Sequence, residues 1–298
     1  MANLIKKIQL LGDAILGNLF KIRIKYDLYV RHSIDIPGEV EPSLMISLTS
    51  YGHRLRHSVE FTLYSILKQS VRPERIIVWV YEGEYADNLL PKSRKLLEKY
   101  GVEFHKYPKD IRSYKKLIPT LEVFPDYHHI IVDDDIYYTS TLIKELYEHH
   151  LSHPKDIIAH AIAIPQFTGN GDTLLPYKQW PQYNNIQNNF QYNPHTVLPI
   201  GYGGIFYPKD AFDKEVENES VFLQLCPQAD DLWFYVHGLR LGIKKIMVTD
   251  SKVHYIQTDL IRQAISKDRL HDTNFGEGQN NVQLENLLSH YNLKIQRT

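Results

Sequence analysis

The first half of the chain alternates short, nearly continuous apolar runs with stretches in which apolar residues recur at helical spacing. The apolar runs are typical of buried strands and span residues 43–54, 74–84, 102–108 and 128–135. The stretches with helical spacing predict helices and span 54–69, 89–101, 113–125 and 139–154. Apolar strands that alternate with helices are typical of a parallel sheet covered on both faces. We therefore predict an α/β fold with a mostly parallel central sheet flanked by helices.

The pattern changes after about residue 155. The segment 168–193 is polar, rich in Asn and Gln, and aromatic, so we expect it to be ordered and to face a ligand. A strand with a double glycine (198–212), a helix (229–242) and a further strand (243–250) follow. The composition near the C-terminus, with "NFGEGQNN" at 274–281, predicts a flexible tail or a lid.

The N-terminus predicts an amphipathic helix that precedes a linker at 33–42. Its apolar face carries Leu4, Ile8, Leu11, Ile15 and Leu19. Across residues 1–31, six basic residues stand against two acidic ones, a balance of +4. Such a helix can lie on an anionic membrane surface, and it can equally pack on the protein's own core or on a partner chain. A signal peptide is not expected, because Asp13 interrupts the apolar stretch and no small-residue cleavage site follows it.

Composition and charge exclude several classes of protein. The net charge of −1 gives no global attraction to nucleic acid. The single cysteine, Cys226, allows no internal disulfide and fits a reducing compartment, so we expect a cytoplasmic protein. No run of 18 apolar residues is present, so we expect no transmembrane helix. The 21 tyrosines suit the binding of a polar ligand such as a sugar, although each can also belong to the core or surface.

The stretch "HHIIVDDDIYY" (128–138) places three adjacent aspartates after a buried strand. The segments "TSYGHR" and "YEGE" also follow predicted strands, and in parallel sheets the ligand crevice lies at the carboxyl ends of the strands. One aspartate could cap the next helix, but three neighbouring carboxylates repel one another unless a cation or a proton relieves them. A divalent metal is the natural relief, and oxygen ligands suit Mg²⁺ or Mn²⁺.

Two competing classes of enzyme fit the sequence less well. A phosphatase with a nucleophilic aspartate pair expects the pair after its first strand, with Thr or Val where Tyr137 stands in this chain. A dinucleotide-dependent oxidoreductase expects G-x-G-x-x-G after the first strand, where this chain has "TSYGHR".

Four segments in order carry a resemblance to a known family: "ISLTSYGHR", "IIVDDDIYY", "GYGGIFYP" and "ADDLWF". Together they resemble GT-A fold glycosyltransferases of the bacterial polysaccharide type, over roughly residues 43–260. The resemblance implies a Mn²⁺ or Mg²⁺ ion held by the D-x-D element, and transfer of a hexosyl unit from a nucleotide sugar, with UDP favoured. The acceptor would be a glycan or a lipid-linked glycan in capsule, O-antigen or lipopolysaccharide synthesis.

The resemblance also divides the chain into parts. Residues 1–40 would form a helical extension and linker, and residues 41–260 the transferase domain. Within that domain, 41–155 would bind the nucleotide and 156–260 the acceptor. Residues 261–298 would form the tail or lid, and residues 1–31 could contact the inner face of the membrane.

The three aspartates divide if the chain stays extended through them. Side chains alternate along a strand, so Asp133 and Asp135 would lie on one side and Asp134 on the other, where it needs its own partner. By resemblance, Asp135 is the first metal ligand, Asp133 contacts the ribose or a metal-bound water, and His254 completes the metal shell. The other candidates for nucleotide binding are Thr49, Tyr51, Arg54, Glu82 or Glu84, Lys116 (with Lys115 and Arg112) and Asp134.

The segment "ADDLWF" is the candidate for acceptor activation. In inverting members of the family, the second acid of such a pair is the general base, which corresponds to Asp231, with Asp230 free to bind an acceptor hydroxyl. The family pair is usually Glu-Asp, and an aspartate at this place could also simply cap the helix. Gly203, Gly204, Trp180 and Tyr202 are the candidates for contacting the sugar, whereas Trp233 is expected in the core. The alternatives are a retaining transferase of the same fold and a non-catalytic glycan-binding protein.

Overall fold

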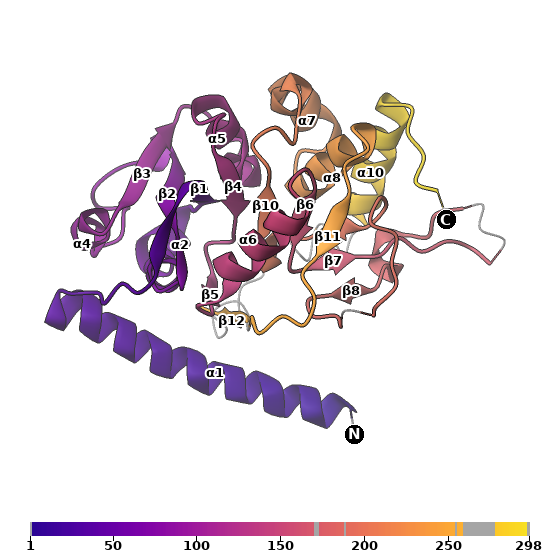
Figure 1. Ribbon diagram of the computed structural model, residues 1–298. Helices are drawn as coiled ribbons and strands as arrows, with labels where there is room; N and C mark the ends of the chain where they lie inside the picture. The colour runs from indigo at the N-terminus through magenta and orange to yellow at the C-terminus, as the bar shows by residue number, and fades with distance from the viewer. Residues whose placement is uncertain (1, 170–172, 188, 254, 259–277, 297–298) are drawn as a thin grey trace.

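A computed structural model describes residues 2–169, 173–187, 189–253, 255–258 and 278–296, with the side chains of 2–11, 13 and 14 left aside (Figure 1). At its centre lies a seven-stranded sheet. In spatial order its strands are β11 (Lys245–Met247), β6 (Ile157–Ala159), β10 (Ile205–Tyr207), β4 (His128–Ile131), β1 (Glu39–Thr49), β2 (Val71–Tyr81) and β3 (Val102–Tyr107). The predicted α/β fold with a mostly parallel sheet is confirmed.

Strand β10 runs antiparallel to both of its neighbours, whereas the other pairings in this sheet are parallel. Its first residue, Ile205, pairs with Ile131, the last residue of β4. The segment that precedes β10 therefore lies at the same edge of the sheet as the carboxyl end of β4. This reversal brings the glycine-rich segment 201–204 to the edge where the acidic triplet begins.

Helices cover both faces of the sheet, and the side chains of β1 accordingly alternate between two cores. Leu44, Ile46 and Leu48 pack in one core with α3 (Val59–Leu67) and α6 (Leu142–Ser152). Met45 points the other way and packs with Ile77 and Trp79. The same side carries α5 (Ile118–Val123) and α8 (Asp230–Arg240), whose core includes Ile205 and Tyr207.

Shorter elements complete the chain and connect these layers. The helices are α2 (Gly52–His57), α4 (Arg94–Lys99) and α7 (Glu219–Leu225), and the 3₁₀ turns are η2 (Glu82–Glu84), η3 (Arg112–Lys116), η4 (Tyr177–Gln179), η5 (Gly201–Gly203) and η6 (Lys214–Glu217). A small antiparallel sheet contains β8 (Gln182–Tyr183), β7 (Ile162–Ala163) and β9 (Leu198–Pro199). Strands β5 (Ile136–Tyr138) and β12 (Tyr255–Gln257) form a separate two-stranded antiparallel sheet.

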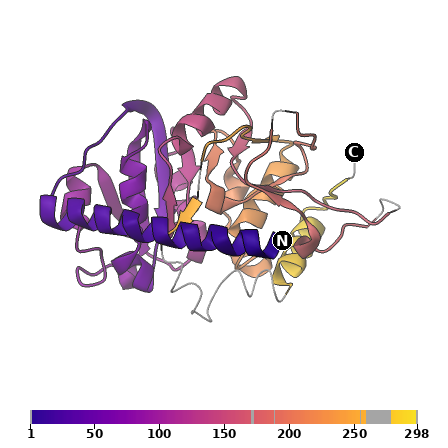
Figure 2. The ribbon, with the colours of Figure 1, turned by 90° about the horizontal axis from the view of Figure 1, so that it is seen from below.

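The N-terminal helix α1 (Ala2–Tyr26) runs along one side of the molecule and continues into a π-helical turn, η1 (Asp27–Arg31) (Figures 1 and 2). Ile24 and Leu28 are buried where the helix packs on α3 and β12. The buried carboxylate of Asp27 accepts a hydrogen bond from the Tyr64 hydroxyl at 2.6 Å. The helix therefore docks on the protein's own core, one of the three positions that its sequence allows.

No described helix has both the length and the apolar composition needed to cross a membrane.

Several predicted boundaries differ from the structure. The helix predicted at 54–69 is divided at Ser58 into α2 and α3, and the predicted linker 33–42 already contains the start of β1. The prediction of a tail is wrong for α10 (Gln279–His290), which packs on α7 and α8 and buries Leu284 and Leu287. Its apolar spacing explains this packing. The rest of the predicted lid, 261–277, lies outside the described residues.

Candidate functional site

The acidic triplet forms a loop at the carboxyl end of β4. The strand ends at Ile131, Asp134 and Asp135 lie in a turn, and β5 begins at Ile136. Arg54 Nη1 lies 3.0 Å from Asp134 Oδ1 and 2.9 Å from Asp135 Oδ2, so these two carboxylates meet one guanidinium. Asp133 instead pairs with Lys116 Nζ at 2.5 Å. The prediction that Asp133 and Asp135 face one side is wrong, because the chain turns at Asp134 and Asp135 and the alternation of side chains ends there.

Asp134 does have a partner of its own. The Ser50 hydroxyl, which follows β1, donates a hydrogen bond to Asp134 Oδ2 at 2.5 Å. Both side chains are buried, and burial raises the pKa of Asp134 although Arg54 and Ser50 oppose that rise. Sequence analysis missed Ser50, whose one signal is its place at the end of the first strand.

The nucleotide-binding candidates at the ends of β1 and β2 differ in exposure and in the groups they contact. Tyr51 is 48% exposed, and its hydroxyl accepts a hydrogen bond from Arg54 Nη2 at 3.0 Å. The Thr49 hydroxyl is buried and donates to the Trp79 carbonyl at 2.8 Å, which stabilises the strand pair. Glu82 is exposed in η2, whereas Glu84 reaches the turn after β1 and accepts from the Gly52 amide at 3.4 Å.

Among the three basic candidates near η3, Lys116 is the one that faces the acidic loop. Lys115 pairs with Asp110, and Arg112 donates to the Pro227 carbonyl at 3.2 Å.

The acidic pair at the start of α8 lies beside Lys116. Lys116 Nζ is 3.7 Å from Asp230 Oδ2, and Asp231 Oδ2 accepts a hydrogen bond from the Gly201 amide at 3.1 Å. The cap residue of α8 is Ala229, which has no side chain that could cap. The alternative that the aspartates serve only as a cap is therefore wrong, because they occupy the first helical turn. The positive end of the helix dipole still lies next to them.

Gly201 is a site residue that sequence analysis missed. A Cβ atom at this position would lie 2.9 Å from Asp231 Oδ1 and 3.6 Å from Lys116 Nζ. The missing side chain lets the backbone amide approach the carboxylate. Its signal was the first glycine of "GYGG", whose other two glycines were chosen instead.

Five aspartates and two protein cations make up what we call the acidic cluster: Asp133, Asp134, Asp135, Asp230, Asp231, Arg54 and Lys116. The pKa of Asp135 is raised to about 7 by burial and then by Asp134 and Asp133. The pKa of Asp231 is raised to about 7 by burial and then by Asp230. Burial opposes the charge of Lys116, but the neighbouring aspartates outweigh it and raise the pKa of that amine. The cluster thus holds more carboxylates than its own cations neutralise.

The Tyr138 hydroxyl joins the acidic loop to the glycine-rich segment. It accepts a hydrogen bond from the Asp133 amide at 3.0 Å and donates one to the Tyr202 carbonyl at 3.0 Å. Tyr202 is half-buried beside Tyr255, whose hydroxyl donates to the Gly203 carbonyl at 3.3 Å. These hydrogen bonds fix the separation between the acidic loop and the glycine-rich segment 201–204.

Three of the candidates for sugar contact belong to the core instead. A Cβ atom on Gly203 would lie 2.6 Å from the Cβ of Ala161, and Gly204 has φ 86° and packs against Leu142. Trp180 is 3% exposed, and its indole donates to the Leu175 carbonyl at 2.9 Å. The prediction that these residues face a sugar is wrong in this structure, because each is enclosed by the protein itself. Trp233 is fully buried, as predicted.

The predicted metal ligands do not form a site among the described residues. Asp133 and Asp135 contact different protein cations, and His254 lies outside the described residues. Within the part of the chain that the structure describes, no three His, Cys, Asp or Glu side chains come together as ligands. Carboxylate oxygens have the right chemistry for Mg²⁺ or Mn²⁺. In the arrangement seen, the protein cations Arg54 and Lys116 contact these carboxylates.

Comparison with known proteins gives little further information. No protein-family model matches the chain, and no curated protein matches it. Among solved structures, CMP:2-keto-3-deoxy-manno-octonic acid synthetase complexed with CTP is similar, with 10% sequence identity and a TM-score of 0.42. The match covers 77% of this chain and 96% of that chain.

We expect Gly203→Ala to destabilise the protein, because the added methyl group would collide with Ala161. Overpacking of this kind costs about 1–3 kcal/mol of the free energy of unfolding. Urea denaturation followed by circular dichroism measures the change. Gly169→Ala is the matched control, since a Cβ there meets nothing within 4 Å. If both variants were as stable as the parent chain, the close packing of Gly203 would be contradicted.

We expect Asp231→Asn to stabilise the protein above neutral pH. In the folded state the pKa of Asp231 is raised to about 7, so its favourable contribution is complete below the unfolded pKa and is lost as pH rises through about 7. Asn cannot ionise and can still accept the hydrogen bond from Gly201. The gain over the parent chain should be near zero at about pH 4 and reach about 1–2 kcal/mol at about pH 8.

Denaturation at the two pH values checks this prediction. Asp126→Asn, at an exposed aspartate, is the control and should show no such difference between the two pH values. A variant Asp231→Asn that is equally or less stable than the parent chain at both pH values would contradict the raised pKa.

Proposed function

We propose that this chain is a glycosyltransferase that moves a hexosyl unit from a nucleotide sugar, with UDP favoured, to a glycan or a lipid-linked glycan. The observation that carries the proposal is the position of Lys116, whose amine lies between Asp133 of the acidic loop and Asp230 at the start of α8. A group transfer needs a donor and an acceptor within bonding distance. Lys116 holds the two acidic elements close enough to serve one donor and one acceptor.

In this proposal the donor nucleotide lies over the ends of β1 and β2. Tyr51 offers an exposed aromatic face beside the Arg54 guanidinium, which lies 4.9 Å from the ring centroid. Such a pair can stack on a base and contact a phosphate. Arg54 and Lys116 supply positive charge where the leaving diphosphate would gather negative charge. The half-buried Tyr202 is the remaining candidate for contact with the sugar.

The chemical step requires a base on the acceptor side, and Asp231 suits that role. Its Oδ1 atom is buried and has no hydrogen-bond partner among the described residues, and its pKa of about 7 matches a base that works near neutral pH. The acceptor oxygen would form a bond to the anomeric carbon as the bond from that carbon to the diphosphate oxygen breaks. The hydroxyl proton would pass to Asp231, and the electron pair of the broken bond would leave with the nucleoside diphosphate. Such a displacement inverts the anomeric centre.

Dependence on Mn²⁺ or Mg²⁺ is part of the proposal. The excess of carboxylates in the acidic cluster favours a cation in addition to Arg54 and Lys116. When bound, the ion would act as a Lewis acid toward the diphosphate. Asp133 and Asp135 are the described candidates to hold it, with His254 as the third. We propose that the enzyme works in the cytoplasm, in the synthesis of capsule, O-antigen or lipopolysaccharide.

We expect UDP or a UDP-sugar to raise the melting temperature of the chain when Mn²⁺ is present. A ligand at about a hundred times its dissociation constant adds roughly 2.7 kcal/mol to the free energy of unfolding. A thermal-stability screen of nucleoside diphosphates and nucleotide sugars, each with and without Mn²⁺, measures the shift. Asp135→Asn should remove the part that depends on Mn²⁺, and the exposed control Asp126→Asn should retain it. No shift with any nucleotide would refute the proposal, and a shift indifferent to Mn²⁺ would refute its metal part.

We expect Asp231→Asn to lower turnover by about 10²–10⁴-fold, which is the usual contribution of a general base. The stabilisation by UDP should remain, because Asp231 lies on the acceptor side. Release of UDP from the best-binding UDP-sugar, with oligosaccharide acceptors present, measures turnover. A retaining transferase would keep substantial activity in this variant, and a glycan-binding protein would release no UDP in the parent chain.

A further inference from the structure

The outward side of α1 carries an exposed apolar stripe, formed by Ile15, Leu19, Ile22 and Tyr26. These side chains are 55%, 57%, 68% and 53% exposed, respectively. Their spacing of three and four residues puts them on one side of the helix. Figures 1 and 2 show α1 along the outside of the molecule in both views. The sequence placed Ile15 and Leu19 on one apolar face, and the structure leaves both of these side chains exposed.

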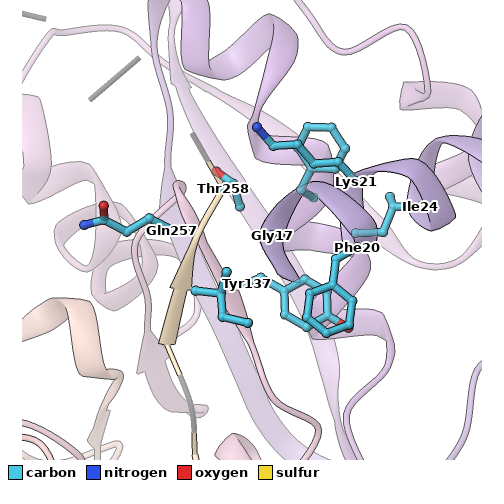
Figure 3. Close-up of a pocket in the computed structure, with 9 residues that line it drawn as sticks. Gly17, Phe20, Lys21, Ile24, Tyr137, Gln257 and Thr258 are labelled. Atoms are coloured by element: carbon cyan, nitrogen blue, oxygen red, sulfur yellow. The ribbon is translucent and has the colours of Figure 1, made fainter. Parts of the chain in front are cut away.

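The opposite side of α1 attaches the helix to the body, so docking on the core does not explain the stripe. Gly17, Phe20 and Ile24 line the seam with Tyr137 and β12, and the rings of Phe20 and Tyr137 stack with centroids 4.6 Å apart (Figure 3). The cavity in this seam has a volume of only about 10 Å³. That is below the roughly 300–1,000 Å³ typical of small-molecule sites. The seam is therefore an attachment of the helix and not a ligand site.

The charges around the stripe identify the kind of partner it fits. At about 100° per residue, Arg23 and Lys25 lie on opposite flanks of the stripe, and both are exposed. Asp27 belongs to the same segment but is buried against the Tyr64 hydroxyl, so it exposes little negative charge. Arg23 pairs with Asp27 yet keeps 67% of its side chain exposed. An apolar stripe with an exposed cation on each flank suits an anionic bilayer surface.

We propose that α1 binds the surface of an anionic membrane, with its axis parallel to the bilayer plane and the stripe at the boundary between headgroups and acyl chains. A second copy of this chain is a weaker candidate. Two such faces would bring together segments that each carry the +4 balance of residues 1–31, and like charges oppose that contact. The proposal concerns binding alone and holds whether or not the chain is a glycosyltransferase.

Flotation of the full chain with lipid vesicles tests the proposal. We expect the protein to float with vesicles that contain phosphatidylglycerol and to remain behind with vesicles of phosphatidylcholine alone. Leu19→Glu and the uncharged Leu19→Gln should each lower the partition coefficient by about tenfold or more, since an inserted leucine contributes at least about 1.4 kcal/mol. Leu151→Glu is the matched control: Leu151 is 62% exposed on α6, and its substitution makes the same charge change away from the stripe.

The outcomes separate the possible occupants. Circular dichroism should show that all variants retain the fold, because the substituted side chains are exposed. The proposal is overturned if the parent chain does not bind anionic vesicles, or if Leu19→Gln and Leu151→Glu bind equally well. It is also overturned if sedimentation without lipid shows a dimer that Leu19→Gln dissociates, since the stripe would then be an interface between copies. A salt-sensitive flotation that depends on Leu19 supports it.

Discussion

The candidate site depends on the neutralisation of carboxylates that the fold forces together. Lys116 pairs with Asp133 at 2.5 Å and lies 3.7 Å from Asp230, so one amine serves two distant segments. A buried charge without a partner is strongly destabilising. This amine therefore offsets much of the repulsion between the two acidic segments. Arg54 acts in the same way on Asp134 and Asp135. Even so, the two cations leave a surplus of carboxylates. Burial, and then this surplus, raises the pKa of Asp135 and of Asp231.

The topology of the sheet creates this crowding. Parallel strands put the ends of β1, β2 and β4 at one edge, and the antiparallel β10 brings Gly201 to the same edge. The Gly201 amide then holds the Asp231 carboxylate, and the Tyr138 hydroxyl fixes the acidic loop to the segment that precedes β10. The site is therefore held by short bonds between backbone and side chains, in addition to the pairing of charges. Such bonds keep the two acidic segments at a constant separation.

Local pattern was enough to predict most of the central strands and the edge of the sheet where the polar groups gather. Apolar runs and helical spacing indicated α8 and every strand of the central sheet except β6, and a strand ending in aspartates indicated the acidic loop. The partners within the site were harder to predict. Arg54 and Asp135 are 81 residues apart in the sequence, and Ser50 and Asp134 are 84 residues apart. Which cation meets which carboxylate depends on a turn after Val132 that ends the alternation of side chains, and no local signal marked it.

The glycines show the same limit. "GYGG" indicated close backbone approach, but the sequence could not say what approaches each position. A side chain at Gly203 would collide with Ala161 of the protein's own core, whereas a side chain at Gly201 would collide with the carboxylate of Asp231. A composition that suits a ligand also suits tight internal packing, and only the tertiary contacts distinguish the two. The same reasoning applies to Trp180, whose large apolar ring was equally suited to a sugar and to the core that encloses it.

Contacts through β5 and β12 link the helix α1 to the acidic loop. Phe20 of α1 stacks on Tyr137, which lies two residues after Asp135 in the sequence. The Thr258 amide, directly after β12, donates a hydrogen bond to the Asp135 carbonyl at 2.7 Å. A membrane that held α1 would thereby also restrict the β5–β12 pair on which the acidic loop rests. Binding at the outer side of the helix would leave these contacts intact, because the stripe and the seam lie on opposite sides.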